Sequence, residues 1–197
     1  MSFLQPSAEQ LGTPEAVQIR AADLANWGFP TNYSELFALA PAAYAAWAEL
    51  NKSIKAGMDP RRYELATLAV AMRRGSTYCS VAHGVQLQSR FYDTETVRRI
   101  AADYHDAGLD EADVAIMDFA VKAADGPASI TAADVAGLRE HGLDDRDVFQ
   151  VLLAVGARCF FTTVLEGAGA QADPEYLDRL GADTAAALTV GRPIAVS

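Results

Sequence analysis

The segment YELATLAVAMRRGSTYCSVAH, residues 63–83, contains the residue types whose spacing best suits chemistry. Cys79 and His83 are four residues apart, so on a helix they lie on one face, one turn from each other. A helix that starts near Ser76 places Cys79 in its first turn, where free backbone N–H groups and the helix dipole favour an anion. This position favours a thiolate, and a neighbouring imidazole can accept the thiol proton.

A carboxylate and a phenol complete this candidate site. Glu64 lies on the helix predicted before Gly75, and a turn at Gly75 folds that helix back so that Glu64 can reach and orient His83. Tyr78 adds a phenol beside the sulfur of Cys79. Spacing alone leaves a plainer interpretation open, in which the cysteine is a small buried hydrophobic residue, the histidine is packed or exposed, and the glutamate is solvated.

Apolar residues at helical spacing run through the chain and supply the elements that position these groups. Helix start and stop signals predict helices over about residues 14–27, 34–54, 60–74, 76–91, 94–104, 110–124, 131–140 and 144–167, with a short one after 173. No run alternates apolar and polar residues as a half-buried strand does. We therefore expect an all-α protein, a bundle of about eight helices.

Composition predicts a soluble chain. Of the 197 residues, 51% are hydrophobic, and 26 acidic against 16 basic residues give a formal charge of −10. Without a basic cluster, the chain is not expected to bind nucleic acid or an anionic membrane.

We divide the chain into an N-terminal arm (1–30), a helical domain (31–190) and a frayed tail (191–197). The apolar run 148–164 contains Arg158 and no secretory signal opens the chain, so a cytoplasmic location is expected.

The remaining cysteine and histidines do not form an obvious second site. Two cysteines, Cys79 and Cys159, are not a disulfide framework, and in the cytoplasm we expect free thiols. His105 and His141 lie at predicted helix ends with no second ligand at helical spacing, so no metal site is expected. No phosphate-binding glycine motif is present, and no cofactor is expected.

The segment around Cys79 resembles the active-site signature of the alkylhydroperoxidase D-like (carboxymuconolactone decarboxylase) family. That signature is a Glu, eleven residues, and then C-x-x-C-x-x-x-H. Glu64 matches the Glu, Cys79 the second Cys and His83 the His, while Tyr78 stands where the family often has Tyr or His. The position of the first Cys is occupied by Ser76.

The flanking sequence is similar to the peroxidase-related branch of this family. Residues 115–169 include IMDFAVKAADG and ITAADVAGLREHGLDD, which resemble that branch's "DFA.K" and "T..DV..LR..GL.D.." patterns. The resemblance covers roughly residues 15–180. It implies an AhpD-like helical bundle that assembles into a closed homo-oligomer.

The resemblance implies thiol chemistry, with Cys79 as nucleophile and Glu64 and His83 as a proton relay. In the family's peroxidases one thiol attacks the peroxide, the other closes a disulfide, and a reductant reopens it. Ser76 cannot form that disulfide, although it can hydrogen bond to a thiolate or cap the helix. We therefore expect a single-cysteine, peroxidase-related oxidoreductase whose sulfenic acid is recycled by an external thiol. Cys159 is expected to be core packing, with a bridge to Cys79 as the alternative.

Two other functions stay open. A carboxymuconolactone decarboxylase-like lyase needs a general acid/base and an anion pocket but no cysteine pair, so Ser76 would not harm it. A non-catalytic member would keep the fold as an oligomeric binding module. The expected partners are a small-molecule peroxide or lactone-type substrate, an external thiol reductant and further copies of the chain.

Overall fold

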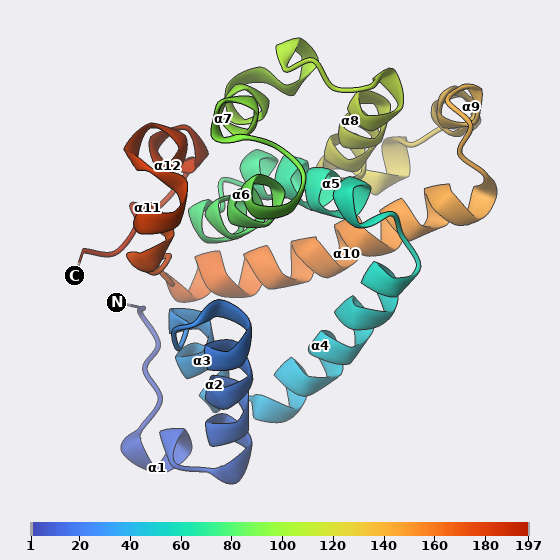
Figure 1. Cartoon of the computed structure of the whole chain (residues 1–197). Coiled ribbons are helices and arrows are strands. Elements are labelled where there is room, and N and C mark those ends of the chain that lie inside the picture. The colour runs from blue at the N-terminus through green and yellow to red at the C-terminus, as the bar shows by residue number, and fades with distance from the viewer. Residues whose placement is uncertain (1, 197) are drawn as a thin grey trace.

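The computed structural model describes residues 2–196, and over that range it contains helices and no strands (Figure 1). The α-helices are α1 Ala8–Leu11, α2 Pro14–Trp27, α3 Asn32–Leu36, α4 Pro41–Ala56, α5 Pro60–Arg73, α6 Thr77–Arg90, α7 Thr94–Asp103, α8 Glu111–Asp125, α9 Ala132–Glu140, α10 Asp145–Ala168, α11 Glu175–Leu180 and α12 Ala182–Leu188. Three 3₁₀ turns join them, η1 Phe37–Leu39, η2 Tyr104–Asp106 and η3 Pro127–Ser129. The predicted all-α class is confirmed.

The additional helices are short pieces at places where the sequence predicted one helix or none. The stretch predicted as one helix over 34–54 is divided by η1, and Pro41 begins α4. Gly181, with a φ of 76°, separates α11 from α12 in the segment after Asp173. The four-residue helix α1 was not predicted.

The helical hairpin of α5 and α6 carries most of the predicted site residues. Asp59 caps α5 by accepting a hydrogen bond from the N–H of Arg62. Gly75 has a φ of 65°, a left-handed conformation that ends the first helix and allows the chain to reverse. Ser76 then caps α6, because its hydroxyl oxygen accepts from the N–H of Cys79 at 3.5 Å. The predicted turn and helix start are therefore present.

The long helix α10 runs through the middle of the molecule, and it packs against α4, α5 and α8 (Figure 1). By length and composition alone it could cross a membrane, since its mean hydropathy reaches 1.8 over 18 residues. Half of that stretch is buried inside the molecule, and Arg158 interrupts it. We therefore describe α10 as a core helix.

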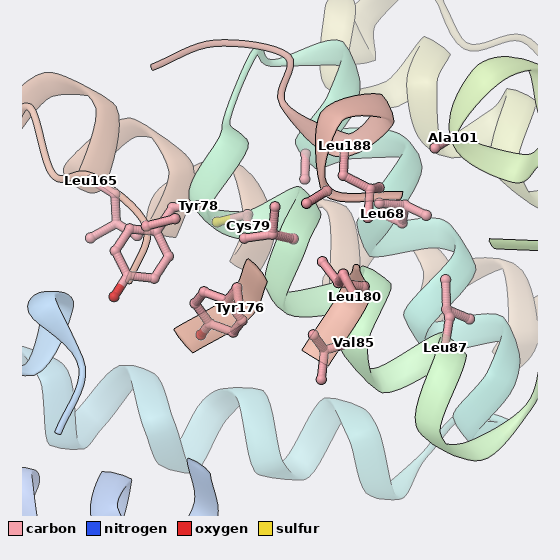
Figure 2. Close-up of a cluster of buried hydrophobic side chains, with 14 of the residues drawn as sticks. Leu68, Tyr78, Cys79, Val85, Leu87, Ala101, Leu165, Tyr176, Leu180 and Leu188 are labelled. Atoms are coloured by element: carbon pink, nitrogen blue, oxygen red, sulfur yellow. The ribbon is translucent and has the colours of Figure 1, made fainter. Parts of the chain in front are cut away.

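The largest cluster of buried side chains surrounds α6 (Figure 2). Leu68 of α5, Leu165 of α10, Tyr176 of α11 and Leu188 of α12 belong to this cluster together with Cys79, which is 2% exposed. A second cluster lies between α5, α8, α9 and α10. Side chains of these four other helices therefore pack around α6 and fix the position of the sulfur.

The C-terminal tail is held against the start of α6, where the sequence predicted a frayed end. The N–H of Gly191 donates to the hydroxyl of Thr77 at 2.9 Å, and the N–H of Ala195 donates to the carbonyl of Ala172 at 2.9 Å. A Cβ on Gly191 would lie 1.9 Å from the carbonyl oxygen of Gly75, so only glycine fits this close approach. Met1 and Ser197, the ends of the predicted arm and tail, lie outside the described residues.

Candidate active site

A cavity of about 500 Å³ opens beside α6 and is lined by residues of α2, α3, α4, α5, α6 and α10. Four of the five predicted site residues line it, namely Glu64, Tyr78, Cys79 and His83. Ser76 does not line the cavity, and it is fully buried at the cap of α6. The predicted arm also takes part, since Asp23 of α2 forms part of the cavity wall.

The predicted pairing of Glu64 with His83 is present. Nδ1 of His83 lies 2.5 Å from Oε2 of Glu64, and both side chains are buried. Nδ1 also lies 3.2 Å from the hydroxyl oxygen of Thr67, whose own O–H donates to the carbonyl of Tyr63 at 2.7 Å. Both partners of Nδ1 are therefore acceptors, so we assign the ring proton to Nδ1 and the free lone pair to Nε2.

Burial and neighbouring charges set the protonation of this pair. Burial lowers the pKa of His83 to about 4, helped by the cation of Arg158 and opposed by Glu64. Burial raises the pKa of Glu64, but the ring N–H of His83 and the ammonium of Lys55, at 3.3 Å, outweigh it and hold the value at about 2. At neutral pH the glutamate is ionised and the imidazole is neutral.

The polar partner of the Cys79 sulfur is Arg158 of α10. Nη1 of Arg158 donates to Sγ at 3.4 Å, and the arginine is 5% exposed. Burial lowers the pKa of the guanidinium, but the electrostatic interactions and hydrogen bonds with Cys79 and Tyr63 outweigh burial and hold this pKa above its usual range. Among residues 2–196, no hydrogen bond joins Cys79 to His83, and no carboxylate forms an ion pair with Arg158. The geometry therefore gives the sulfur a cationic neighbour that the predicted relay did not include.

Tyr78 has its hydroxyl engaged away from the sulfur. The O–H donates to the carboxylate of Asp173, and the hydroxyl oxygen accepts from the N–H of Tyr33 at 3.2 Å. Burial raises the pKa of Asp173 to about 6, although the hydrogen bond from Tyr78 opposes the shift. Burial also raises the pKa of Tyr78 well above its usual range. This network ties α6 to α3 and to the loop before α11, so Tyr78 positions the helix.

Cys159 faces a different part of the core. It is half-buried, packs against the second hydrophobic cluster and does not line the cavity. Arg158, the preceding residue, points to Cys79, and successive side chains on a helix are separated by about 100°. Both cysteines are free thiols. The geometry thus gives no support to a bridge between them.

Sequence reasoning missed Arg158 and the aromatic wall of the cavity. Arg158 was read only as a break in an apolar run, although a single charge in the most apolar helix needs a partner once that helix is buried. Tyr44 and Trp47 of α4 read as ordinary core residues at helical spacing. Only the packing of α4 against α10 shows that they line a cavity that also reaches residues of α6.

The other histidines remain outside this site. His105 is exposed, and its two ring nitrogens lie 3.0 Å from Asp103 and 2.9 Å from Asp118. Within residues 2–196, no group of three or more His, Cys, Asp or Glu side chains is placed to hold a metal ion.

The comparisons with known proteins identify the fold. No protein-family model and no curated protein matches the chain. An uncharacterized peroxidase-related protein from Ralstonia eutropha JMP134, described as an alkylhydroperoxidase AhpD core, matches with a TM-score of 0.81 and 22% identity over 89% of this chain and 94% of that one. A peroxidase-related protein from Silicibacter sp. TM1040 matches with a TM-score of 0.79 and 22% identity over 91% and 95%.

An enzyme is also among the structural neighbours. The debrominase Bmp8 in its apo form matches with a TM-score of 0.73 and 14% identity over 93% of this chain and 96% of its own. A cysteine-to-alanine variant of Bmp8 was solved in complex with 2,3,4-tribromopyrrole, and it matches with a TM-score of 0.70. At these identities the likeness concerns the fold, and the chain has the AhpD-like fold that its sequence predicted.

Proposed function

We propose that the protein is a thiol-dependent oxidoreductase that reduces a peroxide with Cys79 as its single reactive cysteine. The observation that carries this proposal is the contact between Sγ and the buried guanidinium of Arg158, which has no carboxylate partner in the described part of the chain. A buried cation needs an anion, and the thiolate of Cys79 is the group within reach. The position of Cys79 in the first turn of α6 adds the favourable end of the helix dipole.

In the oxidative step the Cys79 thiolate attacks the distal oxygen of a hydroperoxide. The O–O bond breaks, the sulfur gives up two electrons and becomes a sulfenic acid, and the leaving alkoxide takes a proton from water to become an alcohol. His83 accepts a hydrogen bond from the hydroperoxide O–H at its free Nε2, which orients the distal oxygen toward the sulfur. Glu64 holds the imidazole in the tautomer that this role needs.

In the reductive step a small external thiol restores Cys79. The first thiol condenses with the sulfenic acid, releases water and forms a mixed disulfide with Cys79. A second thiol attacks this bond, leaves as the small-molecule disulfide and returns the cysteine thiolate. The chain supplies no resolving thiol near the site, because Ser76 occupies the signature position and Cys159 faces the second cluster.

A lyase acting on a lactone-type anion is the second candidate. It is favoured by the same cavity, in which the Glu64–His83 pair is a potential general base and Arg158 is a potential anion site. We rank it second because Arg158 contacts the cysteine sulfur, for which a decarboxylase has no need. The third possibility, a non-catalytic binding module, requires that Cys79 show no thiol reactivity.

We also propose that the protein assembles with copies of itself in the cytoplasm. Free cysteines suit a reducing compartment. Large apolar side chains remain on the surface of the isolated chain, including Phe149 and Phe160 on α10, which are 60% and 43% exposed. Multi-angle light scattering on the purified protein measures the oligomeric state directly.

Peroxide consumption with a small thiol tests the proposed function. Purified wild type, Cys79→Ser and Cys159→Ser would be supplied with cumene hydroperoxide and dithiothreitol, and residual peroxide would be measured over time. We expect Cys159→Ser to match the wild type and Cys79→Ser to fall to the uncatalysed rate. Equal peroxide consumption by the two variants would reject Cys79 as the nucleophile, and activity of Cys79→Ser on a lactone-type anion would favour the lyase.

A further inference from the structure

The guanidinium of Arg158 has hydrogen-bonding capacity that the protein does not use. Of its five N–H donors, one is directed at Sγ of Cys79, the hydroxyl of Tyr63 is a second hydrogen-bond partner, and Nε is buried without a partner. Arg158 lines the cavity and has no carboxylate partner within residues 2–196. A planar guanidinium in this state is well suited to hold the charged group of a bound anion.

Aromatic rings extend from Arg158 along the cavity wall. The guanidinium lies 5.6 Å from the ring centre of Phe161, and Phe161 stacks on Trp47 with centroids 4.1 Å apart and planes 18° apart. Tyr33 meets Phe161 edge-on at 5.4 Å, and Tyr44 lies 5.9 Å from Trp47. All four aromatic residues line the cavity. This wall offers stacking and edge contacts to a planar ligand.

Asp23 holds the two tyrosines of this wall in position through hydrogen bonds. Its Oδ1 accepts hydrogen bonds from the hydroxyls of Tyr33 at 2.9 Å and Tyr44 at 3.5 Å, and its Oδ2 accepts one from Thr31 at 2.6 Å. Burial raises the pKa of Asp23 despite these bonds. Because three hydroxyls already satisfy the carboxylate, it acts as a positioning residue, and the two tyrosines present their rings to the cavity with their hydroxyls committed.

We infer that the cavity binds an aromatic anion, a molecule of one or two rings that carries a carboxylate or similar charged group. The charged group lies on Arg158 next to the sulfur, and the ring lies along Trp47 and Phe161. A volume of about 500 Å³ suits a ligand of that size. The inference rests on the proposed function for the place where the ligand reacts, and the substrate class that it names is a hydroperoxide that carries such a ring and such a charged group.

Intrinsic fluorescence can report occupancy without a label, because the chain has two tryptophans and both, Trp27 and Trp47, line the cavity. Four probes of similar size would be titrated: benzoate, the neutral benzamide, the non-aromatic cyclohexanecarboxylate and the cationic benzylammonium. We expect benzoate to give a saturable change and to bind at least about tenfold more tightly than each of the other three, since it alone uses both the charge and the ring.

Matched variants assign the contacts. Arg158→Gln should remove the preference for benzoate over benzamide, whereas Arg146→Gln, an exposed arginine on the same helix, should keep it. Trp47→Leu should reduce the preference for benzoate over cyclohexanecarboxylate, with Trp27 as the remaining fluorophore. Equal affinity for benzoate and benzamide, or tightest binding of benzylammonium, would overturn the inference.

The anion-binding inference and the redox proposal can be tested separately. All titrations are made without peroxide and are repeated in Cys79→Ser, which we expect to bind benzoate at least as well as the wild type because Arg158 then lacks a thiolate. Benzoate binding in a protein that consumes no peroxide would reject the redox proposal and keep the anion site. Peroxide turnover in a protein that prefers no aromatic anion would reject the anion site and keep the redox proposal.

Discussion

Arg158 and Cys79 are 79 residues apart in sequence, and the structure places Nη1 of the arginine 3.4 Å from the cysteine sulfur, with both residues buried. The contact joins the central helix α10 to the first turn of α6. In the proposed function, this contact gives the sulfur of Cys79 a cationic partner, although the signature's first thiol is absent. In the same proposal, the neutral imidazole of His83 orients the reactant.

Removing the guanidinium should slow the chemistry of Cys79. We expect Arg158→Gln to reduce the rate of alkylation by iodoacetamide at pH 7 by about 10–100-fold, which corresponds to the loss of one charge-assisted hydrogen bond. Arg158→Lys should give an alkylation rate between those of the wild type and Arg158→Gln, since it keeps the charge but not the planar donor group. Arg146→Gln makes the same change in net charge on the surface of α10 and should have no effect. An unchanged rate in Arg158→Gln would remove the arginine from the account.

Acid should weaken the fold through His83 and Glu64. The folded pKa of His83, about 4, lies below its ordinary value of 6.5, so between these values the unfolded chain binds a proton that the folded chain does not. As pH falls from 6.5 to 4, this difference in proton binding lowers the free energy of unfolding by up to about 3 kcal/mol. Glu64, held at about 2, adds a second loss between pH 4.5 and 2.

Urea denaturation at pH 7 and pH 4.5 checks this dependence. Between pH 7 and pH 4.5, the free energy of unfolding should drop more for the wild type than for His83→Gln. The two free energies should therefore differ less in acid. His141→Gln is the control, because His141 is exposed. Parallel losses in wild type and His83→Gln would mean that the histidine is not held neutral in the folded protein.

Ser76 should matter for stability and not for reactivity. Its hydroxyl caps α6, and it lies outside the cavity. We expect Ser76→Ala to lower the free energy of unfolding by about 1 kcal/mol, the usual loss for a helix cap. The alkylation rate of Cys79 should stay within about twofold of the wild type, since the substitution leaves Arg158 in place. A large fall in that rate would show that the serine acts on the sulfur directly.

The sequence predicted the parts of this site that depend on local structure. Glu64, Cys79 and His83 follow from helix periodicity and one glycine turn, and the Glu64–His83 contact follows from reversing the chain at Gly75. The start of α6 followed from the cap at Ser76. Such features depend on a few neighbouring residues, and propensity and spacing describe those well.

The parts that the sequence did not predict depend on how distant helices pack. Nothing near Arg158 in the sequence indicates that its side chain meets Cys79. The hydrogen bonds of Asp23 with Tyr33 and Tyr44 require α2, α3 and α4 to meet at one place. The tail was predicted to fray because its sequence lacks a helix pattern, whereas its order comes from contacts such as Gly191 with Thr77.

Packing of α12 on α6 can be tested with two glycines in helix interiors. A Cβ on Gly84 would lie 2.3 Å from Cδ1 of the buried Leu188, whereas a Cβ on Gly156 would meet nothing within 4 Å. Gly156→Ala should therefore stabilise the protein by roughly 0.5–1 kcal/mol through helix propensity. Gly84→Ala should destabilise it by about 1–3 kcal/mol, because overpacking outweighs that gain. Equal shifts in melting temperature would show that α12 does not pack on α6 in this way.

The reaction of Cys79 with peroxide is the decisive measurement for the proposed thiol chemistry. Cys159→Ser protein, which leaves Cys79 as its single thiol, would be mixed with one equivalent of cumene hydroperoxide, trapped with dimedone and measured by intact mass and peptide mapping. We expect rapid trapping of a sulfenic acid at Cys79, and trapping at least about tenfold slower when Arg158→Gln is added. A thiol that stays unmodified, or that oxidises equally fast with and without Arg158, would contradict the proposal.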